Sequence, residues 1–104
     1  MQPITPQDYT GTGAAVTLAS ILGVTKCKWF QVTGDAVAGF PARVGDSHVS
    51  LDVASPVTAG RGFPIPGGGG QFSPPIALAM EFYDLTAWWI VVANLDIVSV
   101  ACAI

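Results

Sequence analysis

The chain has 104 residues, which is the usual length of one domain. Only 11% of its residues are charged, against about 25% in a typical globular protein. Hydrophobic residues make up 51%, and so much apolar surface with so little charge excludes a disordered chain. The composition also argues against a nucleic-acid binder, because four Lys and Arg residues and a net charge of -3 neutralise few phosphates.

The surface of such a protein is unusually poor in charge. A folded monomer of 10.7 kDa exposes roughly 5,500 Å². That leaves about one charge per 500 Å², which is sparse for a protein that stays monomeric in water. We therefore expect much of the outside to be covered by another protein.

The chain begins with a segment, residues 1–12, that is rich in Pro, Gly and Thr and carries one charge. We expect it to form an extended N-terminal arm, with residues 13–104 as a single β domain. No basic residue precedes Lys26, so the charged region of a secretory signal is lacking. The apolar run at 14–24 is therefore interpreted as part of the domain.

Alternation of apolar and polar side chains is common along the chain, whereas no window shows the 3.6-residue period of an amphipathic helix. About seven short strands are expected, at residues 15–22, 26–32, 40–44, 48–53, 76–82, 88–93 and 97–102. Gly, Pro, Asn and Asp separate them at intervals typical of a sandwich or barrel. The sequence predicts an all-β fold, a small single-domain β-sandwich or barrel.

One segment of low complexity, the glycine run at 67–70, invites comparison with a phosphate-binding loop. Such a loop needs a following helix whose amides converge on the anion. Pro74 and Pro75 follow shortly afterwards instead. We interpret the run as a flexible connection between strands.

Two cysteines, Cys27 and Cys102, lie in apolar segments that are expected to be strands. A disulfide between them would close a long loop and contribute about 4 kcal/mol. Without a secretion signal, two buried thiols in a reducing compartment are favoured. The pairing stays open at this point.

The C-terminal stretch 85–104 is long and apolar enough for a membrane anchor to be considered. Asp96 would then lie near the bilayer midplane, at a cost of about 2.5–3.5 kcal/mol. No Lys or Arg flanks the stretch, and Asn94 to Asp96 has the composition of a turn between two strands. We expect no membrane span.

Four polar residues, Asp46, His48, Ser50 and Asp52, alternate along one expected strand and resemble the members of a catalytic triad. Side chains two positions apart on a strand are about 6.5–7 Å apart at their bases and stand parallel. They do not converge on one proton path, so a solvated polar face is expected.

No other combination of residues indicates an enzyme. Glu81 and Asp84 could in principle form a glycosidase pair, but so small a barrel offers few polar groups to line a cleft. The single histidine, His48, and two cysteines 75 positions apart give no metal-ligand spacing. We expect no catalysis, no metal and no cofactor.

Aromatic residues are better candidates for a binding role. Trp88 and Trp89 are adjacent, so one faces the core and the other lies at an interface or on a ligand platform. Phe63 and Phe72, on either side of the glycine run, are further candidates for exposed anchors.

The order of short motifs along the chain resembles that of small virion proteins of tailed bacteriophages. The motifs are WFQVTG (29–34), RVGDSHVS (43–50), GFPIPG (62–67), YDLT (83–86) and DIVSV (96–100). The resemblance covers roughly residues 29–100 and implies a β-sandwich or barrel with structural duty on a virion. Proteins of this type are often head decoration (cement) proteins, which sit as trimers at three-fold positions and clamp neighbouring capsomers.

The resemblance and the composition together predict a non-enzymatic decoration protein on the outer surface of a phage head, made in the host cytoplasm. Its partners would be the major capsid protein and further copies of itself, with a trimer favoured. The residues expected at these interfaces are Pro3, Ile4, Tyr9, Phe63, Ile65, Phe72, Trp88 and Trp89. The alternatives are a tail or fibre accessory protein and a receptor- or carbohydrate-binding module.

Overall fold

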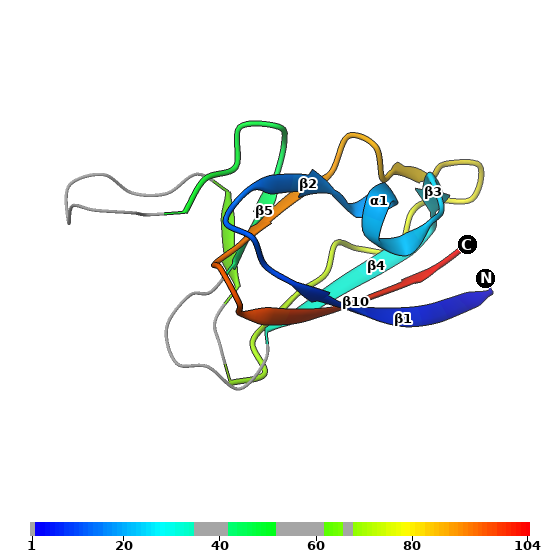
Figure 1. Cartoon of the computed structure of the whole chain (residues 1–104). Coiled ribbons are helices and arrows are strands. Elements are labelled where there is room, and N and C mark those ends of the chain that lie inside the picture. Colours follow the sequence, from blue (N-terminus) through cyan, green and yellow to red (C-terminus); the bar gives the residue numbers. More distant parts are fainter. Residues whose placement is uncertain (1, 35–41, 52–61, 66–67) are drawn as a thin grey trace.

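In the computed structural model, two layers of antiparallel strands lie over one core (Figure 1). The structure describes residues 2–34, 42–51, 62–65 and 68–104. Within these residues, ten strands form three sheets, and one five-residue helix accompanies them. The predicted all-β fold is confirmed.

The longer layer, sheet A, has four antiparallel strands. Their order is β1 (Pro3–Thr10), β10 (Ile97–Ala103), β4 (Trp29–Gly34) and β7 (Gln71–Phe72). Burial alternates along β4 and through most of β10, so every second side chain of these strands points into the core. The strand expected at 97–102 is confirmed as β10, whereas the one expected at 26–32 is divided into β3 (Lys26–Cys27) and β4, which continues to Gly34.

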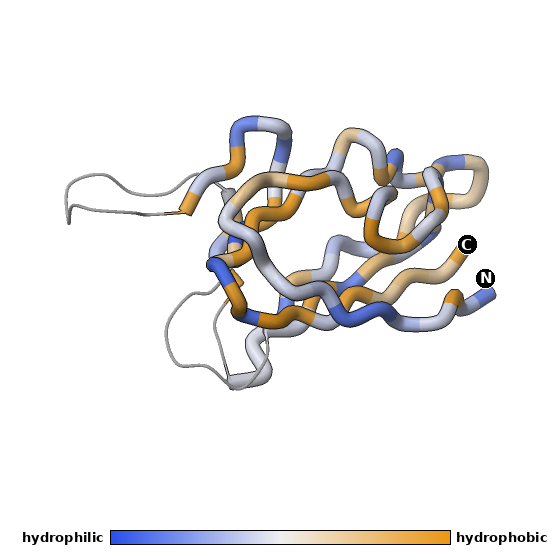
Figure 2. Tube along the Cα trace, viewed as in Figure 1, coloured by the Kyte–Doolittle hydropathy of each residue, from blue (hydrophilic) through white to orange (hydrophobic). Residues whose placement is uncertain are grey.

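The opposite layer, sheet B, also has four strands, and a small sheet C closes one end. Sheet B has the order β2 (Ala15–Thr17), β9 (Trp89–Val92), β5 (Ala42–Gly45) and β6 (Phe63–Ile65). Sheet C pairs β3 (Lys26–Cys27) with β8 (Tyr83–Asp84). Figure 2 shows hydrophobic residues along β10, whereas β1 is mostly pale or blue.

The two layers are joined at a corner where the chain passes twice from one sheet to the other. Gly11 follows β1, and its amide donates to the Asp96 carbonyl, 2.7 Å away. A β-carbon at Gly11 would lie 2.5 Å from the carbonyl oxygen of Val92 and closer still to that of Ala93. Only glycine allows this approach of the two backbones, because neither carbonyl belongs to a side chain that can move.

The second crossing is a tight turn between β9 and β10. The Asp96 amide donates to the Ala93 carbonyl at 3.0 Å, and Leu95 adopts a left-handed backbone with φ 68°. The Leu95 amide donates to the Gly11 carbonyl, also at 3.0 Å. That bond helps to hold a backbone conformation that costs a leucine about 1–2 kcal/mol. The turn expected at residues 94–96 is confirmed.

A short helix, α1 (Leu18–Leu22), replaces the second half of the strand expected at 15–22. The Thr17 hydroxyl caps it by accepting from the Ser20 amide, and Gly23 ends it with φ 76°. Leu18 and Leu22 are buried in the core. The expectation failed because an apolar run fits a buried strand and a one-turn helix equally well.

The largest error concerns residues 76–82, which were expected to form a strand. They form a loop in which the apolar members of the alternation are exposed. The strand expected at 48–53 is also wrong where it is described: residues 47 and 48 form a turn, and Ser50 makes only an isolated bridge. Residues 52 and 53, like Phe40, lie outside the described part of the chain.

The N-terminal segment is extended, as expected, but it is an edge strand of sheet A and not a separate arm. β1 pairs with β10 from Pro3↔Ala103 to Thr10↔Ile97, with a bulge between Ile4 and Gln7. Proline cannot donate to a ladder, which is why Pro3 and the bulge residue Pro6 suggested an irregular segment. An edge strand tolerates both residues, because one side of its backbone has no partner strand.

Both cysteines are free thiols buried in the core, as favoured by the sequence. Burial and, to a smaller extent, the nearby Cys102 raise the pKa of the Cys27 thiol from 9.0 to about 11. A backbone hydrogen bond at Trp29 lowers this pKa by less. Burial also raises the pKa of Cys102. These thiols are therefore small core residues at neutral pH and not nucleophiles.

The raised pKa of Cys27 predicts a loss of stability in alkaline solution. Above about pH 9 the unfolded chain releases the thiol proton, whereas the folded chain keeps it until about pH 11. The free energy of unfolding should therefore fall between these values. In urea titrations the Cys27→Ala variant should show a smaller fall than the wild type, since both proteins carry the same Lys and Tyr residues. Equal falls would contradict this account.

Candidate functional site

Half of the exposed large apolar side chains in the described residues belong to one loop, residues 76–82, which we call the apolar loop. Met80 is 95% exposed and Leu78 is 72% exposed, while Ile76 and Phe82 are more than half exposed. Exposed apolar residues are common singly, but a cluster of this kind is typical of an interaction surface.

Lys28, between β3 and β4, holds the apolar loop in place. Its ammonium nitrogen donates to the Leu78 carbonyl at 2.9 Å and to the carbonyl of Glu81. The same nitrogen lies 4.2 Å from the centre of the Phe82 ring, within the range of a cation–π contact. One side chain thus binds three residues across the loop.

The backbone around Lys28 ties the loop to sheet A. The Lys28 carbonyl accepts from the Ala77 amide at 2.8 Å, and the Lys28 amide donates to the Ala103 carbonyl of β10 at 2.7 Å. The start of the loop is fixed separately, because the Tyr83 hydroxyl donates to the Pro75 carbonyl at 2.6 Å. A tight turn within the loop is closed by the Glu81 amide, which donates to the Leu78 carbonyl at 2.9 Å.

These bonds give the apolar loop a defined shape before any partner arrives. Its polar backbone groups turn toward Lys28, and its apolar side chains are left to the solvent. Fully burying one such side chain contributes about 1.5–3 kcal/mol. A loop that is already ordered loses less conformational entropy on binding, so more of this free energy appears as affinity.

An aromatic cluster connects Tyr83, which follows the loop, to Phe63 in β6, the last strand in the order of sheet B. The Phe63 and Phe72 rings stack with centres 5.1 Å apart, and Trp88 packs against Phe72 and Phe30 at 5.8 and 5.0 Å. Phe63 is more than half exposed, as the sequence predicted for an anchor, whereas Phe72 and Trp88 are half-buried against the core. Phe63 and Trp88 also line a shallow pocket of about 220 Å³ beside Asp46.

The other expected interface residues are distributed over both sheets. Ile65 is fully buried in β6, so its prediction as a contact residue is wrong: its side chain fills the core and cannot reach a partner. Ile4 and Tyr9 are half-buried against the core from β1, and Pro3 is exposed on that strand. Trp89 is half-buried on β9. The structure therefore does not bring these residues together into one surface.

The triad-like residues form no catalytic arrangement where they are described. Asp46 and His48 lie in a turn, where the Asp46 carboxylate accepts from the His48 amide at 2.8 Å. Its Oδ1 atom is 3.5 Å from Nδ1 of the same histidine, and both side chains are about three-quarters exposed. Ser50 is exposed as well, and Asp52 lies outside the described residues. This geometry is that of a solvated turn.

The two acidic residues considered as a glycosidase pair have separate structural roles. Asp84 accepts hydrogen bonds from the Thr86 hydroxyl at 2.6 Å and from the Thr86 amide at 2.9 Å. Both bonds lower the pKa of the Asp84 carboxyl, and the bond from the hydroxyl has the larger effect. Glu81 belongs to the apolar loop, and its carbonyl is bound by Lys28.

Among residues 2–34, 42–51, 62–65 and 68–104, no group of His, Cys, Asp and Glu side chains could hold a metal ion. Within the same residues, no helix has the length and hydrophobicity needed to cross a bilayer. Comparisons of the chain with protein-family models, curated proteins and solved structures find no match.

The apolar loop was missed because alternation shows which side chains share a face, but not what covers that face. Ile76, Leu78, Met80 and Phe82 would have formed the buried face of a strand. One signal pointed the other way: Pro74 and Pro75 remove two ladder donors just before the segment. The contribution of Lys28, about fifty positions away in sequence, had no local signal.

The bonds from Lys28 predict that this side chain controls the rigidity of the apolar loop. Replacing it in Lys28→Met keeps the length of the side chain and removes its donors. Charge-assisted hydrogen bonds contribute about 1.5–3 kcal/mol, so amide hydrogen exchange at residues 78–82 should accelerate roughly tenfold or more.

The matched control is Lys26→Met, which removes the same charge from the neighbouring strand β3. It should leave exchange in the apolar loop unchanged. Equal exchange rates in the wild type and Lys28→Met would show that this lysine does not order the loop.

Proposed function

We propose that this protein is a non-enzymatic structural protein that decorates the outer surface of a bacteriophage head and stabilises contacts between capsomers. The observation that carries this proposal is the apolar loop, an ordered segment with four large apolar side chains open to a partner. The motif resemblance over residues 29–100 supports the placement on a virion, and the sparse charge supports a surface largely covered by protein.

In this proposal the apolar loop, and not the N-terminal segment 1–12, contacts the shell. Because β1 is bonded along β10 within sheet A, it is not free to reach across a joint in the shell. The loop instead projects from the end of the domain beside β3 and β8, near both chain ends (Figure 1). If this end of the domain binds the shell, the outer face of sheet A does not take part in that contact.

Several copies would act together in such a role. In a trimer on a three-fold axis, three loops would engage the shell at once. The second and third contacts are then intramolecular, so modest individual affinities add up to tight attachment. A rigid domain is suited to holding several loops against the shell at the same time.

The proposal predicts that the loop's apolar side chains determine binding to the shell. The double variant Leu78→Ser, Met80→Ser removes two of them without touching the core. Purified protein is mixed with expanded capsids that lack it, and co-sedimentation gives the affinity. Each lost side chain contributes about 1.5 kcal/mol or more when buried, so binding should weaken at least tenfold.

The matched control is Leu95→Ser, because Leu95 is 76% exposed but lies in the turn before β10. It should bind capsids as the wild type does. If the double variant also binds as tightly as the wild type, the loop is not the docking surface. A protein that ignores capsids altogether would contradict the head placement and favour a tail, fibre or receptor-binding module.

A further inference from the structure

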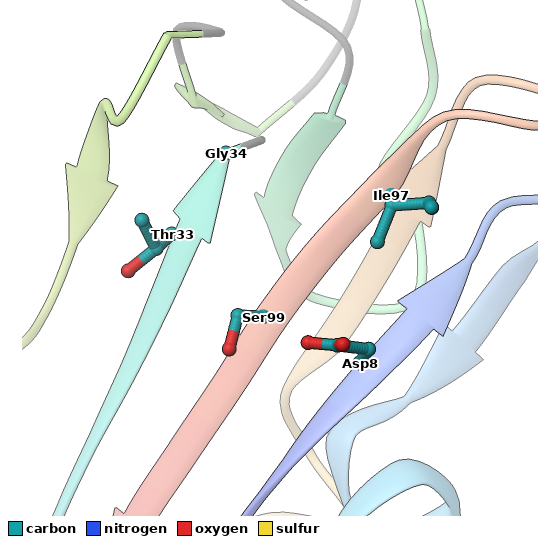
Figure 3. Close-up of a pocket in the computed structure, with 5 residues that line it drawn as sticks. All are labelled: Asp8, Thr33, Gly34, Ile97 and Ser99. Carbon is teal, nitrogen blue, oxygen red and sulfur yellow. The ribbon is translucent and has the colours of Figure 1, made fainter. Parts of the chain in front are cut away.

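The outer face of sheet A carries a row of polar side chains that neither the fold nor the apolar loop uses. The strand register places Asp8 opposite Ser99, Ser99 opposite Thr33, and Thr33 opposite Gln71. The row thus crosses four strands, from β1 through β10 and β4 to β7. Figure 3 shows three of these side chains on adjacent strands, with the Asp8 carboxylate extending toward Ser99.

This row borders a pocket of about 230 Å³. Its lining residues are Asp8, Thr33, Gly34, Ile97 and Ser99. The central strand β10 contributes small side chains, Ser99 and Ala101, whereas β4 contributes larger ones beside them, Gln31 opposite Ala101. Small side chains on β10 therefore lie beside longer ones on β4.

The amide groups next to the pocket are already oriented. The Gln31 side-chain nitrogen donates to the Gln71 side-chain oxygen at 2.6 Å. This bond leaves the Gln71 nitrogen as a donor and the Gln31 oxygen as an acceptor for a ligand. Trp29 lies on the same side of β4 as Gln31 and Thr33 and is half-buried, so part of its ring is available for contact.

The chemistry of this face selects the class of ligand. Hydroxyl and amide groups both donate and accept hydrogen bonds, as sugar hydroxyls do, and an aromatic surface suits the apolar faces of sugar rings. Asp8 is the one charged side chain on the described part of this face, so an anionic ligand would meet repulsion. A divalent cation would find a single carboxylate, which is too few ligands.

We propose that the outer face of sheet A binds a neutral glycan chain that lies along β10. The Asp8 carboxylate accepts hydrogen bonds from sugar hydroxyls, while Ser99, Thr33 and the glutamines donate and accept. Trp29, Gln31 and Thr33 are spaced by about 6.6 Å along β4 and so cover about 13 Å, enough for more than one sugar ring. This face is a different surface from the apolar loop, which lies at one end of the domain.

The full-length protein is tested by affinity electrophoresis in gels that contain dextran, mannan, galactan or xylan, with alginate as the anionic comparison. At least one neutral polysaccharide should retard it, and alginate should not. An oligosaccharide of the retarding polymer then serves as the probe for NMR, in which the amides of Asp8, Thr33, Ser99 and Trp29 should shift. Retardation by none of the neutral polymers, or shifts confined to another face, would overturn the proposal.

The matched variants are Thr33→Val and Thr25→Val. Each replaces a hydroxyl by a methyl group of the same shape, but Thr25 is exposed between α1 and β3, away from sheet A. Losing one hydrogen bond should weaken binding of the oligosaccharide about tenfold in Thr33→Val and leave it unchanged in Thr25→Val. Thermal unfolding of both variants identifies any loss of fold, and equal affinities with intact folds would contradict the assignment.

Discussion

The fold depends on the close contact of two backbones at Gly11. There the chain leaves sheet A for sheet B, and beside it the turn before β10 returns in the opposite direction. A side chain at Gly11 would collide with the carbonyl groups of Val92 and Ala93. Because glycine lets the two crossings touch, the sheets close over one shared core that contains residues from both layers.

This closed core explains where function can lie. The interior is filled by apolar side chains and two protonated thiols, and no buried polar side chain occurs among the described residues. Both functional proposals rest on the surface: one on a loop ordered by Lys28 at one end, the other on a polar face of sheet A.

The connection from core to loop passes through Lys28. Its backbone amide is bonded to β10, its carbonyl to the loop, and its ammonium group to two loop carbonyls. The rigidity of sheet A is thereby extended to a segment that has no ladder of its own. This arrangement lets four apolar side chains stand in solvent without collapsing onto the domain.

The sequence predicted β10 well, because its alternation reflects one buried and one open face, and it placed β4 only approximately, since residues 26–27 belong to sheet C. The prediction failed outside the central strands, where the pattern of apolar and polar residues does not reflect a half-buried strand. In β1 the prolines hid an edge strand, and in α1 an apolar run hid a helix that Thr17 and Gly23 delimit. Residues 76–82 alternate as a strand would, but they form an exposed loop. The hydrogen bond that orders this loop comes from Lys28, which is distant in sequence.

The candidate site was predicted only in part. Phe63 is exposed, as an anchor would have to be, but Ile65 two residues later is buried because a strand alternates its faces. The polar row on sheet A could not be found from spacing, because its members come from four strands whose register is set by long-range pairing.

The bonds from Lys28 order the apolar loop before it meets a partner. The most direct measurement is the ¹⁵N relaxation of the free protein, which gives backbone order parameters for residues 76–82. Values near about 0.85, similar to those of β10, would agree with a preformed docking surface held by Lys28. Values below about 0.6 would describe a mobile segment and contradict the account.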